Sequence, residues 1–433
     1  MFKVVVVGGG MAGCAAALAA AKAGAQVTLL ERTDMLIGVA VRAGETNGNG
    51  WFVAHHELRC MGAGELSDAI ESLKLHDGVK FPDSSRHAFI FNTGLAEPLV
   101  KRLVKEAGIE IVLENRAVDV QKEKGHILAV KLADGRMVEG DAFVDCTGGR
   151  GGMSVCRRYG KGCVMCLVKC PAFGDRIGMV EKAGGKVYDM HRSDGNHGHL
   201  NPAVAIFKDT LAPELKARVE KEGLLTIPLP EALVDYSKHG LMGGLRTKDF
   251  LKNLIMSDIG PVAKLSGCVY MPLAELRQVP GFENVEVEDP RASRYNHLSH
   301  VAIAFRDSAL RVRGIGNLFC GGDKAGHGSV GGAITSGILA GHNAARTAFQ
   351  LDPLVLPLTI ALGDFFAYAT EKYKTLAGRN KGYHMGRGEY WEKMLQAGLY
   401  TDDVTKIRRR VEEAGMLGVF AKKLSWSVSP LEK

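Results

Sequence analysis

The sequence predicts an α/β protein whose parallel sheet is assembled from distant chain segments, with an inserted domain and a helical C-terminal extension. Lys3–Val7 is a β-branched run that leads into a glycine-rich turn and an alanine-rich helix. A second glycine-rich stretch follows a short apolar segment within 314–332. The middle of the chain has scattered prolines and lacks the alternation of strands and helices that indicates a parallel sheet.

Length and composition set the class of the protein. The chain has 433 residues, 46% hydrophobic and 24% charged, which excludes disorder, collagen and coiled coil. This length predicts two or three packed units. The net charge of +7 slightly favours an anionic partner. The chain has nine cysteines, no recognisable secretory leader and no apolar stretch long enough for a membrane span, so we expect a cytoplasmic protein with reduced thiols.

The first thirty residues form a strand, a turn, a helix and a second strand. Gly8-Gly9-Gly10-Met11-Ala12-Gly13 has the G-x-G-x-x-G spacing, and a helix is expected from Cys14 to Ala23. In such a unit the glycines allow a tight turn, close approach of backbone N–H groups to a pyrophosphate, and close packing of helix on sheet. The helix N-terminus adds partial positive charge. The residues predicted to bind a dinucleotide here are Gly8, Gly10, Met11, Ala12 and Gly13.

The second strand, Val27–Leu30, ends in Glu31, and Arg32 follows. A carboxylate at this place accepts hydrogen bonds from the ribose hydroxyls of an adenosine. Because it would repel a 2′-phosphate, NADP is disfavoured, and FAD and NAD remain. We assign Glu31 and Arg32 to the cofactor site.

Later segments favour FAD over NAD. Thr147 and Gly148 lie in a small-residue loop that follows a strand. The loop is similar to the segment at which the chain of many flavoproteins returns to the cofactor. Gly322-Asp323 follows another apolar strand, where flavoproteins bind the ribityl chain through an aspartate. The helix after it, with Gly331 near its start, is expected to approach the flavin and stabilise its anionic reduced form.

Four further strands precede the Thr147 loop. We interpret them as a β-meander of the kind inserted in flavoprotein FAD domains. They are expected at Ile109–Val112, Val118–Gln121, Ile127–Leu132 and Met137–Glu139.

These motifs resemble the glucose-inhibited division protein A superfamily. The resemblance rests on Val7–Cys14 and on Asn317-Leu318-Phe319, Gly322, Gly326, Ala333 and Gly337–Ala345. It implies a two-part FAD-binding Rossmann-like domain of the glutathione-reductase type. Relatives include a tRNA wobble-uridine carboxymethylaminomethyl enzyme and the folate-dependent tRNA uracil-5 methyltransferase. Asp323 stands where those RNA enzymes usually carry glutamine, so RNA is not the favoured substrate.

We divide the chain into six segments. The FAD-binding parts are expected at 1–42, 86–150 and 296–350, and the substrate domain at 43–85 and 151–295. The helical extension covers 351–433, with helices expected at Ile360–Leu376, Glu389–Ala397 and Asp402–Ala414.

The cysteines between 156 and 170 carry several hypotheses. The spacing of Cys163, Cys166 and Cys170 before Pro171 resembles part of a ferredoxin motif, and Cys156 is a candidate fourth ligand of an iron–sulfur cluster. Alternatively, Cys163 and Cys166 form a redox-active pair. A third hypothesis makes one of them a catalytic nucleophile or a substrate-positioning thiol, and a fourth leaves unligated thiols packed beneath the flavin.

His327 and Lys324 are the other catalytic candidates, because both follow Gly322-Asp323. His327 would donate to the flavin or protonate the substrate, or it would only cap the helix. Lys324 would pair with the flavin or an anionic substrate. His55 and His56, expected in a loop before Cys60, are more typical of a solvated or substrate-facing loop than of a metal site.

The sequence therefore predicts a FAD-dependent oxidoreductase that passes a hydride or electron pair to a small molecule or a partner protein. No clean second G-x-G-x-x-G for stable NAD(P)H binding occurs outside the turns already assigned to the flavin, so NAD(P)H would dock only transiently as a donor. The alternatives are a flavin- and folate-dependent RNA uracil methyltransferase, using Cys60 or a cysteine of 163–170, and a flavin electron-transfer subunit. Arg408–Arg410 would contact nucleic acid in the first alternative, although a solvated helix face is the commoner role of such residues.

Overall fold

In the computed structural model, the apolar runs that precede the glycine turns form strands of one parallel sheet. The structure describes residues 1–46, 48–79, 85–149, 178–189, 199–201, 203–237, 249–266, 271–288, 297–299, 302–379, 383–386 and 388–426. Within these residues no helix combines the length and apolar character that crossing a bilayer requires.

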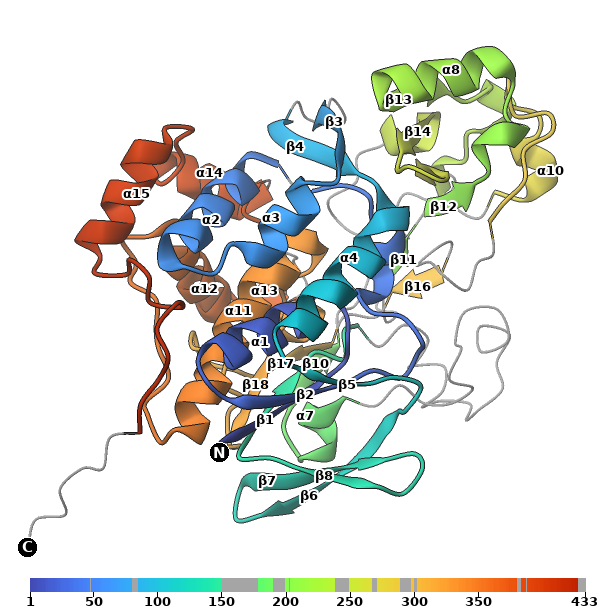
Figure 1. Cartoon of the computed structure of the whole chain (residues 1–433). Coiled ribbons are helices and arrows are strands. Elements are labelled where there is room, and N and C mark those ends of the chain that lie inside the picture. The colour runs from blue at the N-terminus through green and yellow to red at the C-terminus, as the bar shows by residue number, and fades with distance from the viewer. Residues whose placement is uncertain are drawn as a thin grey trace, which may run out of the picture.

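A five-stranded parallel sheet forms the centre of the molecule (Figure 1). Its strand order is β18 (Leu318–Cys320), β9 (Ala142–Asp145), β1 (Lys3–Val7), β2 (Gln26–Leu30) and β5 (Glu110–Val112). The chain therefore returns to this sheet from positions far apart in sequence, as the α/β interpretation requires. The prediction for Ile109–Val112 was wrong in one respect, because β5 pairs with β2 at the sheet edge and does not join the meander. Short apolar strands of both kinds look alike in sequence.

Two helices made largely of small residues pack together on this sheet. They are α1 (Met11–Lys22), which begins three residues earlier than expected, and α11 (Ser329–Ala348). A Cβ on Gly337 would lie 2.3 Å from the carbonyl oxygen of Ala12, and one on Gly341 would lie 2.0 Å from that of Ala16. The equal offset shows that the helices run parallel, so both N-termini point toward the carboxyl edge of the sheet.

Beyond the sheet, the meander keeps three of the four predicted strands. These are β6 (Ala117–Glu123), β7 (His126–Leu132) and β8 (Met137–Glu139). Figure 1 shows this meander on the side of the sheet away from α1 and α11.

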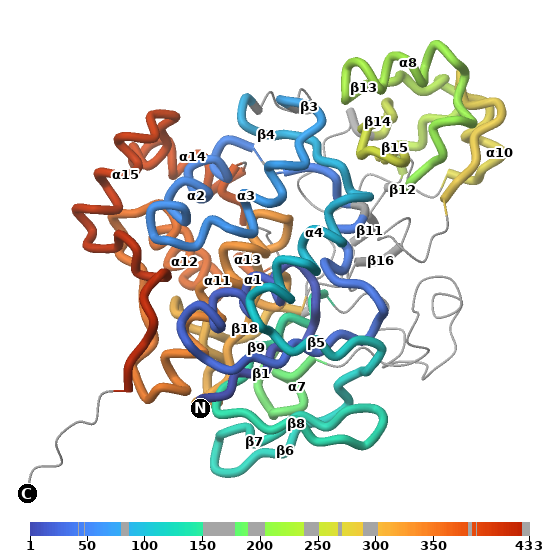
Figure 2. Tube along the Cα trace, in the orientation of Figure 1, coloured from blue at the N-terminus to red at the C-terminus, as the bar shows by residue number. Residues whose placement is uncertain are grey.

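Residues 203–288 contain a second hydrophobic core, built on a four-stranded antiparallel sheet. The order is β12 (Ala203–Ile206), β15 (Ala263–Ser266), β14 (Asn253–Asp258) and β13 (Leu224–Pro228). Three short helices accompany it: α8 (Pro213–Glu222), α9 (Asp249–Lys252) and α10 (Leu273–Leu276). In Figures 1 and 2 this lobe stands apart from the parallel sheet.

The range 43–85 belongs in part to the main core. It includes α2 (Gly48–Met61) and α3 (Glu65–Glu71), whose buried faces join the large hydrophobic cluster. The hairpin of β3 (Lys74–Val79) and β4 (Ser85–Phe91) follows, and then α4 (Thr93–Glu106). His55 and His56 lie in α2 and not in the predicted loop. The prediction was wrong because the glycines and histidines of this helix obscure its apolar spacing in the sequence.

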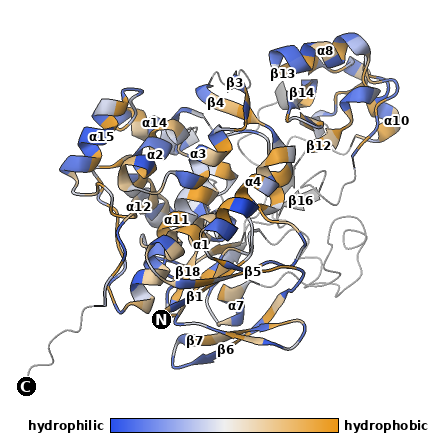
Figure 3. Ribbon diagram, in the orientation of Figure 1, coloured by the Kyte–Doolittle hydropathy of each residue, from blue (hydrophilic) through white to orange (hydrophobic). Residues whose placement is uncertain are grey.

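The remaining elements are short strand pairs and the C-terminal helices. The pairs are β10 (Val187–Asp189) with β17 (Ala302–Ala304), and β11 (His199–Asn201) with β16 (His297–Ser299), and α7 (Met179–Lys182) precedes β10. The helices are α12 (Ala361–Lys372), α13 (Leu376–Arg379), α14 (Gly388–Gln396) and α15 (Val404–Glu413). Figure 3 shows α15 as mainly hydrophilic, with Ile407 and Val411 buried.

A buried carboxylate joins the C-terminal helices to α2. Glu57 is fully buried, and it accepts hydrogen bonds from the backbone N–H groups of Ala361 and Leu362, at 2.8 and 2.9 Å, and from Arg410 Nη2 at 3.0 Å. Figures 1 and 2 show α15 beside α2. One side chain thus ties together the start of α12, α15 and α2.

We expect Glu57→Gln to lower the free energy of unfolding by about 2 kcal/mol, because the amide presents a donor to groups that also donate. Urea unfolding measures the change, and Glu413→Gln, at an exposed position of α15, is the matched control. Equal stability of the two variants would contradict the role of Glu57.

Candidate functional site

The candidate site lies at the carboxyl edge of the parallel sheet and begins at the predicted glycine turn. Gly8 has a φ of +103°, which favours glycine, and a Cβ there would lie 2.4 Å from the carbonyl oxygen of Cys146. A Cβ on Gly13 would lie 1.7 Å from the carbonyl oxygen of Gly8. The first and last glycines therefore have the mechanical roles expected from the motif.

The middle glycine of the motif leaves room for a ligand. A Cβ on Gly10 would meet no atom within 4 Å. Gly10 is also the N-cap of α1, and no side chain caps this helix end. Met11 and Ala12 supply the first backbone N–H groups of the helix, which have no partner within the helix. The structure thus places free space directly against uncapped N–H groups, as an anion-binding helix N-terminus needs.

The acidic residue predicted to bind ribose stands beside this turn. Glu31 Oε2 accepts a hydrogen bond from Gly9 N at 2.7 Å, and Oε1 accepts one from Thr33 N at 2.9 Å. These bonds fix the carboxylate at the end of β2. The next residue, Arg32, has a buried Nη1 with no partner among the described residues. An unsatisfied buried donor of this kind needs an acceptor, which an adenosine-containing cofactor would supply.

The third part of the site follows β9. Asp145 is fully buried, and its Oδ1 accepts hydrogen bonds from Thr147 N at 3.0 Å and Thr147 Oγ1 at 2.7 Å. Its Oδ2 accepts from Val180 N at 2.9 Å. A Cβ on Gly148 would meet nothing within 4 Å. Sequence reasoning did not single out Asp145, although an acid at the end of a buried strand was a usable signal.

The predicted ribityl aspartate lies against this same loop. Gly149 N donates to Asp323 Oδ2 at 3.3 Å, so the turn after β18 contacts the loop after β9. Gly322 N donates to Ser336 Oγ at 2.8 Å, and a Cβ on Gly322 would lie 3.0 Å from the Cβ of Ala12. The structure therefore brings the Gly322-Asp323 turn to the N-terminal end of α1.

Lys324 does not reach the surface of this site. Its side chain is only 1% exposed, and its Nζ donates to Glu181 Oε2 at 3.2 Å. The burial and the pairing with Glu181 fit a positioning role for Lys324 better than the predicted pairing with the flavin or an anionic substrate.

His327, which belongs to the same turn, is also buried. It is 1% exposed, and its ring packs on Phe365 and Phe366 at centroid distances of 4.9 and 5.0 Å. Arg306 Nη2 lies 2.8 Å from its Nε2. Arg306 can only donate, so Nε2 is the acceptor and the ring is neutral. This geometry does not fit proton donation from His327 to a substrate, and the His327 side chain does not cap α11 either, because the N-terminus of that helix has no side-chain cap.

Arg306 is the central residue that sequence reasoning missed. It is 5% exposed and donates to Ala325 O at 2.9 Å, in addition to the contact with His327. Tyr373 Oη donates to Gly326 O at 2.7 Å. Together these side chains fix the position of the turn at 322–328 through hydrogen bonds. The β17 strand before Arg306 gave no sequence signal for such a role.

Gly331 is glycine for a packing reason. A Cβ there would lie 2.4 Å from the ring of Trp51, which is 6% exposed. The ring of Trp51 therefore covers the first turn of α11, and the N-cap Gly328 has no side-chain cap. No side chain caps this helix end, but Gly331 itself faces protein, so its assignment to the cofactor site stays a prediction.

Only some of the cysteines lie among the residues that the structure describes. Cys156, Cys163, Cys166 and Cys170 lie outside the described residues, so the hypotheses about them stay predictions. Cys14, Cys60, Cys146 and Cys320 form no disulfide. Burial raises the pKa of both Cys14 and Cys320 to about 12, so these thiols near the site are not reactive.

The buried histidines make stability depend on pH. Burial lowers the pKa of His327 well below its usual value of 6.5, and it lowers the pKa of His342 to about 4. The unfolded chain takes up these protons near pH 6.5, but the native chain does so only at lower pH. We expect the full stability above pH 6.5 and a loss as the pH falls toward 4.

Urea unfolding at a series of pH values checks this loss. His342→Leu is expected to make the pH dependence shallower, whereas His126→Gln, at an exposed position, is the control. Identical pH dependence in wild type and His342→Leu would contradict the assignment.

The site as a whole fits an adenine dinucleotide. Space stands against uncapped N–H groups at Gly10, an acid ends β2, and Arg32 has an unsatisfied buried donor. The turn at Gly322-Asp323 closes the other side of the same edge. These are the parts expected for phosphates, ribose and the ribityl chain.

Comparison with known proteins agrees with this geometry. A family model for FAD dependent oxidoreductases matches residues 3–151, and one for glucose inhibited division protein A matches residues 271–352. Two crystal structures of Aquifex aeolicus GidA have similar folds. Form II gives a TM-score of 0.65 at 15% identity, covering 95% of this chain and 76% of that one. Form I gives 0.63 at 16% identity, covering 95% and 78%.

Proposed function

We propose that this chain, which belongs to the GidA-like superfamily of FAD-dependent oxidoreductases, passes a hydride or electron pair between its FAD and a small molecule. One observation carries the proposal most strongly. Segments near residues 10, 31, 148 and 323 meet at one edge of the sheet and leave free space against the first glycine turn, which supports a dinucleotide site there.

Each residue of the site has a separate task in this proposal. Gly10 and the first turn of α1 would hold the pyrophosphate, and Glu31 would orient the adenosine ribose. Asp323 is the candidate partner of the ribityl chain. FAD supplies the acceptor and donor of the electron pair. The N-terminus of α11, which no side chain caps, would supply partial positive charge to the flavin.

We propose that Arg306 and Glu181 position the turn at 322–328 without touching the substrate. Arg306 holds Ala325 O and His327, and Glu181 holds Lys324. A neutral His327 accepts the hydrogen bond that keeps Arg306 in place. We therefore assign proton transfer to neither His327 nor Lys324, and we propose that both keep the turn rigid.

Among the described residues, the positions of Cys60 and Arg410 do not support the RNA alternative. Cys60 lies nine residues after Trp51 in α2, so it is about 13 Å further along the helix from the first turn of α11. Its backbone carbonyl accepts from Gly418 N. Arg410 is used by the buried Glu57, which leaves Arg408 and Arg409 as the exposed arginines of that triplet.

The direct test is anaerobic reduction of the FAD-loaded chain. NADH or NADPH is added, and the visible absorbance of the flavin is followed with and without an artificial electron acceptor. We expect bleaching by one nicotinamide and recovery when the acceptor is added. A bound flavin that neither nicotinamide nor dithionite reduces would contradict the proposal.

The same preparation separates the alternatives. Iron and acid-labile sulfide in protein purified without oxygen would support a cluster on Cys156, Cys163, Cys166 and Cys170. Nucleic acid that stays bound, with an affinity that falls steeply with salt, would favour the RNA enzyme. Turnover with nicotinamide and artificial acceptors, but with no organic substrate, would favour an electron-transfer subunit.

A further inference from the structure

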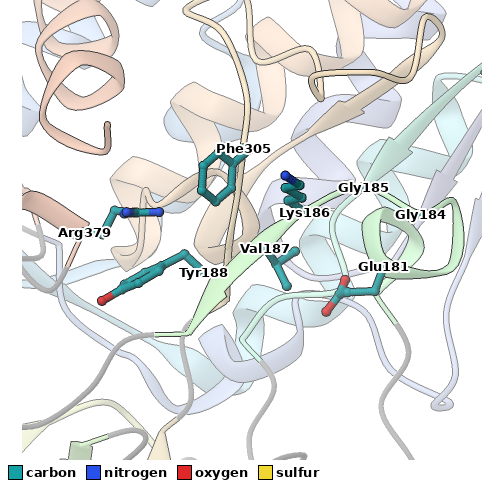
Figure 4. A pocket seen from close by; sticks show the side chains of 8 residues that line it. All are labelled: Glu181, Gly184, Gly185, Lys186, Val187, Tyr188, Phe305 and Arg379. Carbon is teal, nitrogen blue, oxygen red and sulfur yellow. The ribbon is translucent and has the colours of Figure 1, made fainter. Parts of the chain in front are cut away.

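A second cavity lies apart from the glycine turn, between α7, β10 and α13 (Figure 4). It has a volume of about 500 Å³. Its side chains include Glu181 from α7, Lys186 and Tyr188 from the segment that forms β10, Phe305 after β17, and Arg379 at the end of α13. This volume lies within the range of sites for small organic ligands.

The two cations of this cavity have no acidic partner among the described residues. Arg379 Nε donates to Thr375 O at 3.2 Å, and the guanidinium lies 4.5 Å from the ring centroid of Tyr188 and 5.1 Å from that of Phe305. Its remaining N–H donors make no hydrogen bond within the described part of the chain. Lys186 is exposed at the other side of Phe305. Both cations are therefore available to an anion.

The one acid of the lining is already neutralised. Glu181 Oε2 accepts from Lys324 Nζ, and Lys324 is almost fully buried. The cavity consequently presents two positive side chains and a paired acid. Its electrostatic field favours a negatively charged ligand.

We propose that this cavity binds a ligand that combines a planar ring with a phosphate or carboxylate group. A guanidinium with a free edge is suited to two parallel hydrogen bonds with such a group. Stacking on Tyr188 fixes the plane of Arg379 and leaves that edge available. Phe305 and Tyr188 supply apolar surface for the ring. A nucleoside monophosphate and an aromatic carboxylate share this chemistry.

The cavity is joined to the proposed flavin turn at two places. Lys324 of the turn contacts Glu181 of the cavity, and Phe305 of the cavity precedes Arg306, which holds Ala325 O. An anion near Lys186 and Arg379 would thus bind next to residues that position the turn. The inference goes beyond the proposed function, because binding in this cavity does not require electron transfer.

Calorimetric titration of the FAD-loaded chain tests the proposal. The probes are AMP, 4-hydroxybenzoate and inorganic phosphate, and bound FAD prevents AMP from occupying the adenosine part of the glycine turn. We expect AMP or 4-hydroxybenzoate to bind more tightly than phosphate, with an affinity that falls as salt rises. Arg379→Gln and Lys186→Gln should each weaken binding by about tenfold or more.

Lys374→Gln is the matched control, because it removes a positive charge near Arg379 from a residue that does not line the cavity. It should bind as wild type does. Circular dichroism and the flavin spectrum establish that all variants are folded. If the chain binds no FAD, the titration is repeated with Gly10→Val, whose valine side chain would keep AMP out of the glycine turn. AMP binding by this variant would support the cavity proposal even though the proposed FAD function had failed.

Three results would overturn the proposal. The first is no binding of AMP or 4-hydroxybenzoate at millimolar concentration. The second is binding that Arg379→Gln and Lys186→Gln leave unchanged. The third is phosphate binding as tightly as either ring-bearing probe, since this would remove the role of Phe305 and Tyr188.

Discussion

Gly10→Val is expected to yield a folded protein that has lost FAD. A Cβ at this position meets no protein atom within 4 Å, and the backbone angles of Gly10, φ −66° and ψ 178°, are open to any residue. The valine side chain would fill the space in front of the first turn of α1. We expect FAD affinity to fall at least 100-fold, or about 3 kcal/mol, which is comparable to losing two charge-assisted hydrogen bonds.

Fluorescence titration with FAD measures this loss, and urea unfolding of the flavin-free protein measures stability. Gly13→Ala is the contrasting variant, because its Cβ would lie 1.7 Å from Gly8 O. It should lose stability as well as FAD. A Gly10→Val protein that binds FAD as tightly as wild type would contradict the location of the pyrophosphate.

Arg306→Met is expected to have the largest effect among the residues that do not touch the cofactor. Arginine donates to Ala325 O, His327 Nε2 and Thr370 Oγ1 in a buried environment. Methionine fills similar volume but leaves these acceptors without donors. We expect the free energy of unfolding to fall by about 3 kcal/mol or more.

FAD affinity should fall with it, by about tenfold or more, because the turn at 322–328 loses its support. Thermal unfolding and FAD titration are measured on the same preparations. Arg313→Met is the matched control, since Arg313 is exposed on the same segment. Wild-type stability and affinity in Arg306→Met would show that the buried cation does not support the turn.

The sequence predicted the parts of the fold that depend on local patterns. The β1–α1–β2 unit, the glycine roles at Gly8 and Gly13, and the acid at Glu31 all follow from short-range rules. The three helices predicted in the C-terminal extension agree with α12, α14 and α15 to within a few residues, but the short α13 was not predicted as a separate helix. These features depend on neighbours in sequence, so a single chain carries enough information to place them.

Features that depend on distant contacts were not predictable in the same way. The Ile109–Val112 strand looked like part of the meander, but its partner β2 lies about 80 residues earlier. Trp51 gave no reason to expect that its ring would cover Gly331. Arg306 was indistinguishable from a surface arginine. Burial of His327 and Lys324 likewise depends on residues from α7, α12 and β17 that the turn itself does not specify.

We infer that one FAD lies along the glycine turn, Glu31 and the Gly322-Asp323 turn. It is tested most directly by titrating the flavin-free, folded chain with FAD, with FMN in parallel. We expect one FAD per chain and much weaker binding of FMN, which lacks the adenosine that Glu31 would hold. A chain that is folded by circular dichroism but binds no FAD, or binds FMN as tightly as FAD, would contradict it.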